Sequence, residues 1–294
     1  MTNTCDTAAG ITQALAAHGE AASQLRGRAD RVRARHYGSA VYVWALVVFS
    51  NYCRRACPSC QLNRLQDIPQ RYRLSTEEVM GGIRHAWLAG IKTVMLHAAE
   101  DDGLDPGWLR EIIVRARGEY GLSVIISTGV RTPHETEMWR SAGGTVVVYR
   151  SHQQHTERDG RLNVITEALG ALRQEERLYA PVEQIIPFLG SLRVNPSPAD
   201  KELMLNTLAL MRIMRPFLHI PAPVIRGNEA CDFLRQGLGA GADLLLQDYT
   251  PSPYSGRHNY SAIQECLGAT RRECGNCLEK IVQPIGRHID MSFI

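Results

Sequence analysis

Apolar and polar positions along the chain switch repeatedly between a strand-like and a helix-like pattern. Residues 41–49 form an almost unbroken apolar run rich in Val, which is typical of a strand buried on both faces of a parallel sheet. We predict further strands at 93–97, 123–127, 145–149, 183–188, 217–220 and 241–247. Segments of helical periodicity lie between them, at 75–88, 107–120, 133–142, 163–174, 199–214 and 228–238.

Capping residues support these boundaries. Ser75 is a good N-cap, Glu78 three residues later completes a capping box, and Gly90 ends the same helix. Residues 1–37 also have a helical pattern. They carry a run of arginines that we interpret as a solvated helix face, with binding of phosphate or an acidic partner as the alternative.

Strict alternation of strands and helices predicts parallel strands with right-handed crossovers. We count about seven strand–helix units and expect an α/β fold, a closed or incomplete (β/α) TIM-type barrel. A doubly wound open sheet is the runner-up, but no Gly-rich turn follows the first strand. We expect an N-terminal helical segment at 1–37, the barrel at 38–260 and a C-terminal extension at 261–294. The chemistry of such a barrel lies at the carboxyl ends of its strands.

Composition narrows the class of protein. The chain has 294 residues, with 33 Lys and Arg against 30 Asp and Glu, and a net charge of +3 is too small to indicate nucleic acid. Its longest apolar stretch, residues 40–49, is far shorter than the roughly 20 residues of a membrane helix. The first ten residues lack a signal-peptide pattern. We therefore expect a cytoplasmic protein with no nucleic-acid and no membrane partner.

Three cysteines, Cys53, Cys57 and Cys60, follow the first predicted strand with the spacing C-x3-C-x2-C. Three thiolates can bind three irons of a [4Fe-4S] cluster and leave the fourth iron open to a ligand. The alternative is that Cys57 and Cys60 form half of a structural zinc site. The position at the catalytic edge of a barrel favours the open cluster.

The loop at 49–54, Phe-Ser-Asn-Tyr-Cys-Arg, resembles the cluster loop of the radical S-adenosylmethionine (SAM) superfamily, in its biotin synthase-like branch and most closely in the HydE group. Residues 93–101 resemble the second strand of that group, and 161–163, 220–222 and 250–254 resemble later segments in the same order. The resemblance implies a [4Fe-4S] cluster on the three cysteines. It also implies reductive cleavage of SAM to a 5′-deoxyadenosyl radical, which acts on a small molecule in metallocofactor maturation or biosynthesis.

The resemblance also implies residues that bind SAM. Glu100, at the end of the second strand, is expected to bind the amino group, and Arg161 the carboxylate. His152 stands where the group has a glutamate, and a histidine there can donate to a ribose or a carboxylate. An electron donor of the flavodoxin or ferredoxin type and a partner maturase or homologue are implied as partners.

A second group of cysteines, Cys266, Cys274 and Cys277, has the spacing C-x7-C-x2-C. HydE-like proteins with an auxiliary iron–sulfur cluster use this spacing, so the resemblance implies a second cluster here. Zinc, or reduced thiols near the surface, is the alternative.

Several departures favour a divergent enzyme. Ser59 replaces an aromatic residue, Ala98 and Ala99 replace Ser-Gly, and the segment from 149 to 183 is about one strand–helix unit shorter than the resemblance predicts. A rival hypothesis is therefore an iron–sulfur scaffold or partner protein that does not cleave SAM, and a third is a zinc-binding structural protein. The intact C-x3-C-x2-C favours the enzyme.

Overall fold

The computed structural model describes residues 7–56, 62, 64–65, 70–148, 161–174, 196–225, 228–255 and 277–292. The chain forms two compact units. Unit 1 is Met1–Val41, His152–Leu245 and Asn276–Ile289, and unit 2 is Tyr42–Ser151, Leu246–Gly275 and Asp290–Ile294. The predicted division into 1–37, 38–260 and 261–294 was based on sequence motifs and not on compact units. It stays a prediction.

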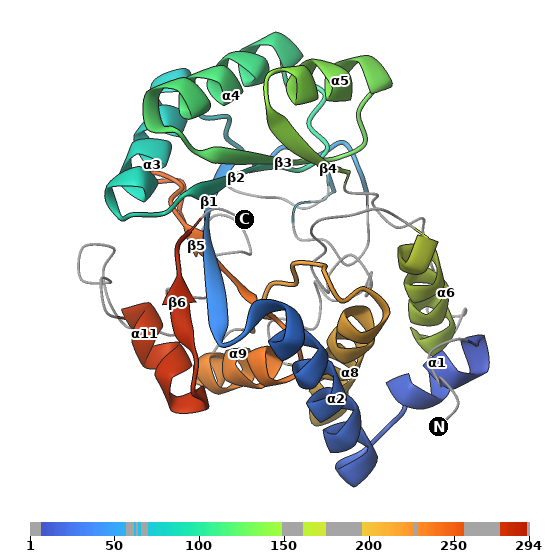
Figure 1. Cartoon of the computed structure of the whole chain (residues 1–294). Coiled ribbons are helices and arrows are strands. Elements are labelled where there is room, and N and C mark those ends of the chain that lie inside the picture. Colours follow the sequence, from blue (N-terminus) through green and yellow to red (C-terminus); the bar gives the residue numbers. More distant parts are fainter. Residues whose placement is uncertain are drawn as a thin grey trace. The chain divides into compact units, whose positions relative to one another are not determined.

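The sheet is built around a long buried strand, β1 (Figure 1). Its order is β4-β3-β2-β1-β5, with β6 also paired to β1, and the β1/β2, β2/β3 and β3/β4 ladders are parallel. The strands are β1 (Ala40–Ser50), β2 (Thr93–Ala98), β3 (Ser123–Thr128), β4 (Gly144–Val148), β5 (Leu244–Asp248) and β6 (His288–Asp290). Five predicted strands, including 41–49, are thereby confirmed, while 183–188 lies outside the described residues.

Three helices connect the strands of unit 2: α3 (Thr76–Leu88), α4 (Pro106–Tyr120) and α5 (Pro133–Ser141). The predicted capping box of α3 is present: Ser75 Oγ accepts the Glu78 N–H at 3.2 Å, and the Glu78 carboxylate accepts the Ser75 N–H at 2.7 Å. Gly90 follows that helix with a φ of +87°, which only glycine adopts readily. Local sequence signals therefore fix these helix ends.

The described part of unit 1 is largely helical. It contains α1 (Ala8–Leu15), α2 (Gly19–Tyr37), α6 (Arg161–Gln174), α8 (Pro198–Met214), α9 (Ala230–Gly239), α11 (Cys277–Val282) and the 3-10 helix η4 (Gln283–Ile285). The single helix expected up to residue 37 is two helices, because Gly19 has a φ of +55° and breaks the pattern. The interpretation of a solvated arginine face is wrong for Arg33, which is buried and bonds to Asp30 at 2.8 Å.

The strand predicted at 217–220 is absent from the described residues, where an isolated parallel bridge joins Pro221 to Leu244. Two hydrogen bonds support it, from Ala222 N–H to the Leu244 carbonyl at 2.8 Å and from Asp243 N–H to the Ile220 carbonyl at 3.1 Å. Prolines at 216, 221 and 223 have no amide hydrogen to donate, so the ladder cannot extend.

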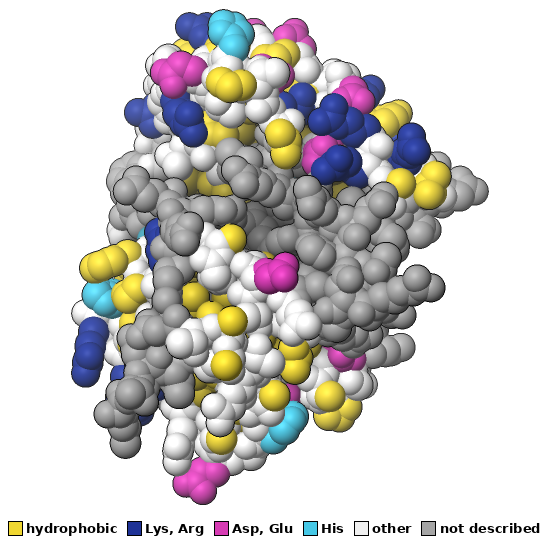
Figure 2. Space-filling model, turned by 90° about the vertical axis from the view of Figure 1, so that its right-hand side faces the viewer, with side chains coloured by type: hydrophobic (Ala, Val, Ile, Leu, Met, Phe, Trp, Pro, Cys, Tyr) yellow, Lys and Arg dark blue, Asp and Glu magenta, His cyan; other side chains and the backbone are white. Residues whose placement is uncertain are grey.

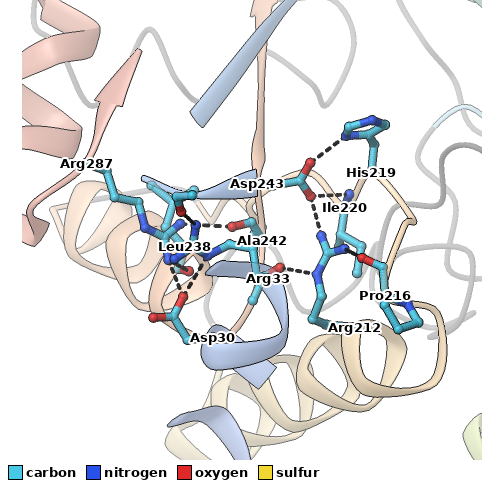
Figure 3. Close-up of polar contacts among 12 residues, drawn as sticks. Asp30, Arg33, Arg212, Pro216, His219, Ile220, Leu238, Ala242, Asp243 and Arg287 are labelled. Atoms are coloured by element: carbon cyan, nitrogen blue, oxygen red, sulfur yellow. Dashed lines mark hydrogen bonds and ion pairs between the residues drawn. The ribbon is translucent and has the colours of Figure 1, made fainter. Parts of the chain in front are cut away.

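A buried polar network surrounds Asp243 in unit 1 (Figure 3). One carboxylate oxygen, Oδ1, accepts hydrogen bonds from Arg212 and, at 2.9 Å, from the backbone N–H of Ile220. The other, Oδ2, lies 2.5 Å from Nδ1 of His219. Arg212 is itself fully buried, so each charge of this pair is neutralised by the other.

Arg287 extends the polar contacts toward the C-terminal end of unit 1 (Figure 3). Its guanidinium donates to the carbonyls of Ala242 at 3.0 Å and Leu238 at 2.6 Å, and it pairs with Asp30. Burial lowers the pKa of Arg287 to about 10, and repulsion from Arg33 acts in the same direction. Arg287 is still protonated at neutral pH and ties the segment before β6 to α2 and α9.

Candidate active site

The carboxyl ends of β1 and β2 lie side by side in unit 2. Ser50, the last residue of β1, is paired with Ala98, the last residue of β2. The segment that leaves β1 carries Cys53, and the segment that leaves β2 carries Glu100 and Asp101. Because parallel strands end at the same edge of a sheet, these two segments meet there, where barrel enzymes bind their ligands.

Cys53 is the predicted cluster ligand that falls within the described residues; Cys57 and Cys60 lie outside them. Its thiol is free and partly exposed, and the backbone N–H of Arg55 points at its Sγ with an N···S distance of 3.5 Å. Hydrogen bonds of this kind stabilise a cluster thiolate. Over the part of the chain that the structure describes, no group of three His, Cys, Asp or Glu side chains is placed to hold a metal ion.

Asn51 joins the two ends of the cysteine loop, residues 51–72, by hydrogen bonds. Its fully buried amide accepts the N–H of Tyr72 at 2.7 Å and donates to the Gln70 carbonyl at 3.1 Å. Arg71 donates in return to the Asn51 carbonyl at 2.6 Å. One amide group therefore holds the start and the end of the loop together. Sequence reasoning gave Asn51 no role.

Asp101 joins the loop to the end of β2. The planar fork of Arg73 binds it with two hydrogen bonds of 2.7 Å each. Ser50 Oγ donates to Oδ2 at 2.6 Å, and the Gly103 N–H donates to Oδ1 at 2.9 Å. Burial acts to raise the pKa of Asp101, but these bonds outweigh it and hold the pKa below its ordinary value. Asp101 is therefore ionised at neutral pH.

Tyr52, the residue before Cys53, contacts two members of this network, Arg73 and Ser50. The guanidinium carbon of Arg73 lies 4.0 Å from the centroid of the Tyr52 ring, a cation–π contact. The Tyr52 N–H donates to Ser50 Oγ at 3.2 Å. The residue before Cys53 is thus held on its ring and on its backbone.

Glu100 is the predicted SAM ligand that the structure describes, and its side chain is only 5% exposed. Arg54 donates from Nε to Oε2 at 3.1 Å and from its backbone N–H to the Glu100 carbonyl at 2.8 Å. The bond to Glu100 raises the pKa of Arg54. Arg55 Nε lies 3.3 Å from Oε1 as an ion pair, yet Oε1 has no hydrogen-bond partner. A buried oxygen that lacks a donor can accept a hydrogen bond from a ligand N–H or from a water molecule.

Gly129, just after β3, makes room for Glu100. A Cβ at position 129 would lie 1.8 Å from Glu100 Cγ, far inside van der Waals contact. Only glycine therefore permits the observed position of the Glu100 carboxylate. No sequence pattern indicates this requirement, because it arises from packing between two strand ends.

His97 of β2 and Ser127 of β3 face each other one step before this edge. They are paired across the ladder, both are buried, and Nδ1 of the histidine lies 3.1 Å from the serine Oγ. This contact gives His97 a structural role between the two strands.

The remaining predicted site residues are not placed by the structure. Arg161 begins α6 and Cys277 begins α11, but their side chains are outside what is described. His152, Cys266 and Cys274 lie wholly outside the described residues. The structure thus brings Cys53 and Glu100 to one edge and leaves the second cluster site as a prediction.

Two curated enzymes are similar to the chain over most of its length, although no protein-family model matches it. The [FeFe] hydrogenase maturase subunit HydE of Thermotoga maritima is 25% identical over 88% of this chain and 84% of HydE. The 3-methylornithine synthase of Methanosarcina barkeri is 29% identical over 82% of this chain and 79% of that enzyme. This chain is a relative of the radical SAM enzymes. The resemblance seen in the cysteine loop is thereby confirmed, as is the prediction of an enzyme related to HydE.

Solved structures agree on the fold. Methylornithine synthase (PylB) superposes with a TM-score of 0.72 at 21% identity, over 97% of this chain and 94% of PylB. The maturase HydG from Carboxydothermus hydrogenoformans gives a TM-score of 0.67 at 17% identity, over 98% of this chain and 76% of HydG. The predicted α/β fold is confirmed, and the described strands form an open sheet, as expected of an incomplete barrel. The segment predicted to be short, 149–183, lies mostly outside the described residues.

Ion pairs occur on the helices of unit 2 and beside them. On the face drawn in Figure 2, Lys and Arg side chains lie beside Asp and Glu side chains. Arg115 pairs with Glu119 at 2.7 Å and Arg131 with Glu135 at 3.7 Å. Among the described helices, none has both the length and the apolar character of a membrane span.

Proposed function

We propose that this chain reductively cleaves SAM to a 5′-deoxyadenosyl radical that acts on a small-molecule substrate. The observation that carries the proposal is the edge formed by β1 and β2, where the Cys53 loop is fastened to Glu100, a buried carboxylate with one oxygen lacking a donor. A [4Fe-4S] cluster with bound SAM would supply the electron and the radical. The similarity to HydE and to 3-methylornithine synthase supports the same reaction class.

Three thiolates would hold the cluster, from Cys53, Cys57 and Cys60. The chain contributes the N–H bond from Arg55 onto the Cys53 sulfur, at 3.5 Å, and the Asn51 amide that fixes both ends of the loop. Three protein ligands leave the fourth iron open, which suits chelation by the amino and carboxylate groups of SAM.

Glu100 suits the amino group of SAM by hydrogen bonding. Its unpartnered Oε1 is a buried acceptor, and an amino group bound to iron keeps two N–H donors. Arg161 would bind the SAM carboxylate with its planar fork, and His152 would donate to the ribose or to that carboxylate. These three side chains complete the SAM ligands of the proposal.

The proposal includes accessory parts. Cys266, Cys274 and Cys277 would hold a second iron–sulfur cluster, and a flavodoxin or ferredoxin would supply electrons in the cytoplasm. The names of the relatives point to maturation of a metallocofactor or to synthesis of an amino-acid-like product, with a partner maturase or homologue in the first case.

The second candidate function is an iron–sulfur scaffold that holds a cluster without cleaving SAM. The substitution that favours it is His152, since a histidine cannot replace the charge of a glutamate. The two functions differ in one product, free 5′-deoxyadenosine.

The deciding experiment is anaerobic reconstitution of the full chain with iron and sulfide, followed by dithionite and SAM. We expect 5′-deoxyadenosine from the wild type and none from Cys53→Ala, with the iron content reduced in the variant. A wild type that binds a [4Fe-4S] cluster but forms no 5′-deoxyadenosine would refute SAM cleavage and support the scaffold.

A further inference from the structure

The cysteine loop carries the excess charge of the whole chain. Residues 51–72 contain four arginines, one aspartate and no lysine, so the net charge of the loop is +3, the same as that of the chain. The residues outside the loop are therefore balanced in charge. Positive charge gathered in one place attracts an acidic partner more strongly than the same charge spread over the surface.

Three of these arginines lie at the surface beside Cys53. The side chains of Arg54 and Arg55 are 48% and 44% exposed, and both pair with carboxylates at the end of β2. Arg64 is exposed as well, and its backbone N–H donates to the Arg55 carbonyl at 2.7 Å, so these two parts of the loop lie side by side. Among the residues that the structure describes, no carboxylate pairs with Arg64. Its charge is therefore available to a partner.

Large apolar side chains are exposed among these arginines. Leu65 is 74% exposed, Val130 46% and Tyr52 36%. Val130 is held near the end of β2, because its neighbour Arg131 donates to the Asp101 carbonyl at 2.7 Å. In the described part of the chain, three of the seven exposed large apolar side chains thus lie in the loop or beside it. Such gathering marks a surface that binds another molecule.

These side chains together have the composition of a protein-binding surface. We call it the loop face, and it consists of Tyr52, Arg54, Arg55, Arg64, Leu65 and Val130. Protein interfaces are enriched in tyrosine and arginine and depleted in lysine. Arginines near an iron–sulfur cluster also offset its negative charge, but that role alone requires no exposed apolar side chains. The charge of the loop face selects an acidic protein, and its apolar side chains supply contact area.

The position of the loop face indicates what this acidic protein does. Tyr52 and Arg54 flank Cys53, so a protein bound here lies next to the proposed cluster. Each cleavage of SAM consumes one electron, which has to reach the cluster from outside the chain. Electron transfer slows steeply with distance, so the carrier has to bind close to the cluster. Complexes of electron carriers are small and short-lived, which suits steering by charge.

We propose that the loop face is the docking surface for a small acidic protein that carries one electron. The reduced carrier gives up one electron, which passes through the cluster to the sulfonium of SAM. The C5′–S bond then breaks, methionine leaves, and the 5′-deoxyadenosyl radical keeps the unpaired electron. This inference rests on the proposed function, because a chain that does not cleave SAM needs no such electron.

The first test measures binding by isothermal titration calorimetry, with the anaerobically reconstituted full chain and two probes, an acidic flavodoxin and an acidic ferredoxin. We expect Arg64→Glu to weaken binding of the carrier about tenfold at low ionic strength and to reduce its dependence on salt. Leu65→Ser should weaken binding about threefold and leave the salt dependence unchanged, because it removes apolar contact and no charge. Arg64→Lys keeps the charge and should retain most of the affinity.

Helix α3 provides matched controls. Arg84 is exposed and Leu88 is 61% exposed, and both lie toward the end of α3 that leads into the amino end of β2, away from the cysteine loop. Arg84→Glu and Leu88→Ser should bind the carrier almost as the wild type does. Equal losses of affinity in Arg64→Glu and Arg84→Glu would overturn the docking surface, as would a wild type that binds neither probe.

The second test compares two reductants in the formation of 5′-deoxyadenosine. Saturating dithionite needs no docking, so Arg64→Glu and Leu65→Ser should form the product as fast as the wild type. With a limiting amount of reduced carrier, the rate of Arg64→Glu should fall about tenfold, in step with its affinity.

Equal losses with dithionite and with the carrier would overturn the proposal and assign Arg64 to support of the cluster. Wild-type rates with the carrier in both variants would also overturn it and leave the loop face to another partner. A wild type that forms no 5′-deoxyadenosine with dithionite would refute the proposed function itself, so the two failures are distinguishable.

Discussion

Unit 1 and unit 2 each bury a carboxylate against arginine, but in only one of them do both carboxylate oxygens have hydrogen-bond partners. Asp243 in unit 1 has donors on both oxygens, one of them a backbone N–H, and its partner Arg212 is fully buried (Figure 3). Glu100 in unit 2 has a buried oxygen without a donor and partners that are half exposed. Burial of charge is common to both, and only the missing donor distinguishes a binding position from a structural one.

The difference follows from where the partners come from. Arg212 lies within α8, and its position is fixed further by donation to the Gly241 carbonyl at 2.8 Å. Arg54 and Arg55 belong to a loop, whose residues adapt to a ligand more easily than those of a packed helix. Rigid partners make Asp243 part of the framework, whereas the loop partners of Glu100 leave one of its oxygens without a hydrogen bond.

The largest effect on stability is expected from Arg212→Met. The substitution leaves Asp243 buried with its charge uncompensated, which should lower the free energy of unfolding by about 3–5 kcal/mol. Urea denaturation followed by circular dichroism measures this. Arg115→Ala, which removes an exposed pair with Glu119, is the matched control and should leave the midpoint almost unchanged. Equal shifts for the two variants would contradict the framework role of Asp243.

Glu100→Gln should act on binding and hardly on stability. The neutral amide still accepts the Arg54 hydrogen bond, but it no longer offers a charged acceptor to the amino group of the ligand, so affinity for the uncleavable SAM analogue S-adenosylhomocysteine should fall by about 30-fold or more. The melting temperature should stay within a few degrees of the wild type, whereas Asp243→Asn should lower it clearly. A large fall in the melting temperature of Glu100→Gln would show that Glu100, like Asp243, has a structural role.

Gly129→Ala tests whether the place of Glu100 matters. The added methyl group overlaps Glu100 Cγ, so we expect destabilisation of about 1–3 kcal/mol and weaker binding of S-adenosylhomocysteine. Gly118→Ala is the control: this glycine lies within α4 with no atom near its missing side chain, and alanine there should stabilise the helix. Wild-type affinity in Gly129→Ala would show that Glu100 binds the ligand from another position.

Acid pH gives the smallest expected effect. Because the pKa of Asp101 is lowered in the folded protein, its contribution to stability is complete above the ordinary aspartate value and is lost as the pH falls through the lowered one. Asp101→Asn should therefore make the loss of stability below about pH 4 shallower, by at most about 1.4 kcal/mol per pH unit. If the free energy of unfolding of the wild type and of the variant fell in parallel at acid pH, protonation of Asp101 would not be coupled to stability.

Local features of the fold were predictable from the sequence. The Val-rich run gave β1, and Ser75 with Glu78 gave the start of α3, since both signals act within a few residues. The strand predicted at 217–220 was wrong because apolar periodicity does not register the missing amides of neighbouring prolines.

The site was predictable only where chemistry dictates residue type. Cys53 and Glu100 stood out by motif and by resemblance, whereas Asn51 and Gly129 did not. Both of these act through contacts with residues distant in sequence, Tyr72 in one case and Glu100 in the other. Requirements of that kind appear only after the strand ends have come together.

The Asn51 amide also makes the cysteine loop exchangeable as a unit. Because Asn51 joins the stem at Gln70 and Tyr72, the sequence between those points can change while β1 and α3 keep their ends. A chimaera that carries a relative's loop on this stem would therefore compare cluster environments on one constant scaffold. Sequence changes confined to this loop are expected to leave the supporting sheet unaltered, so a change in the reactivity of the proposed cluster would come from the loop itself.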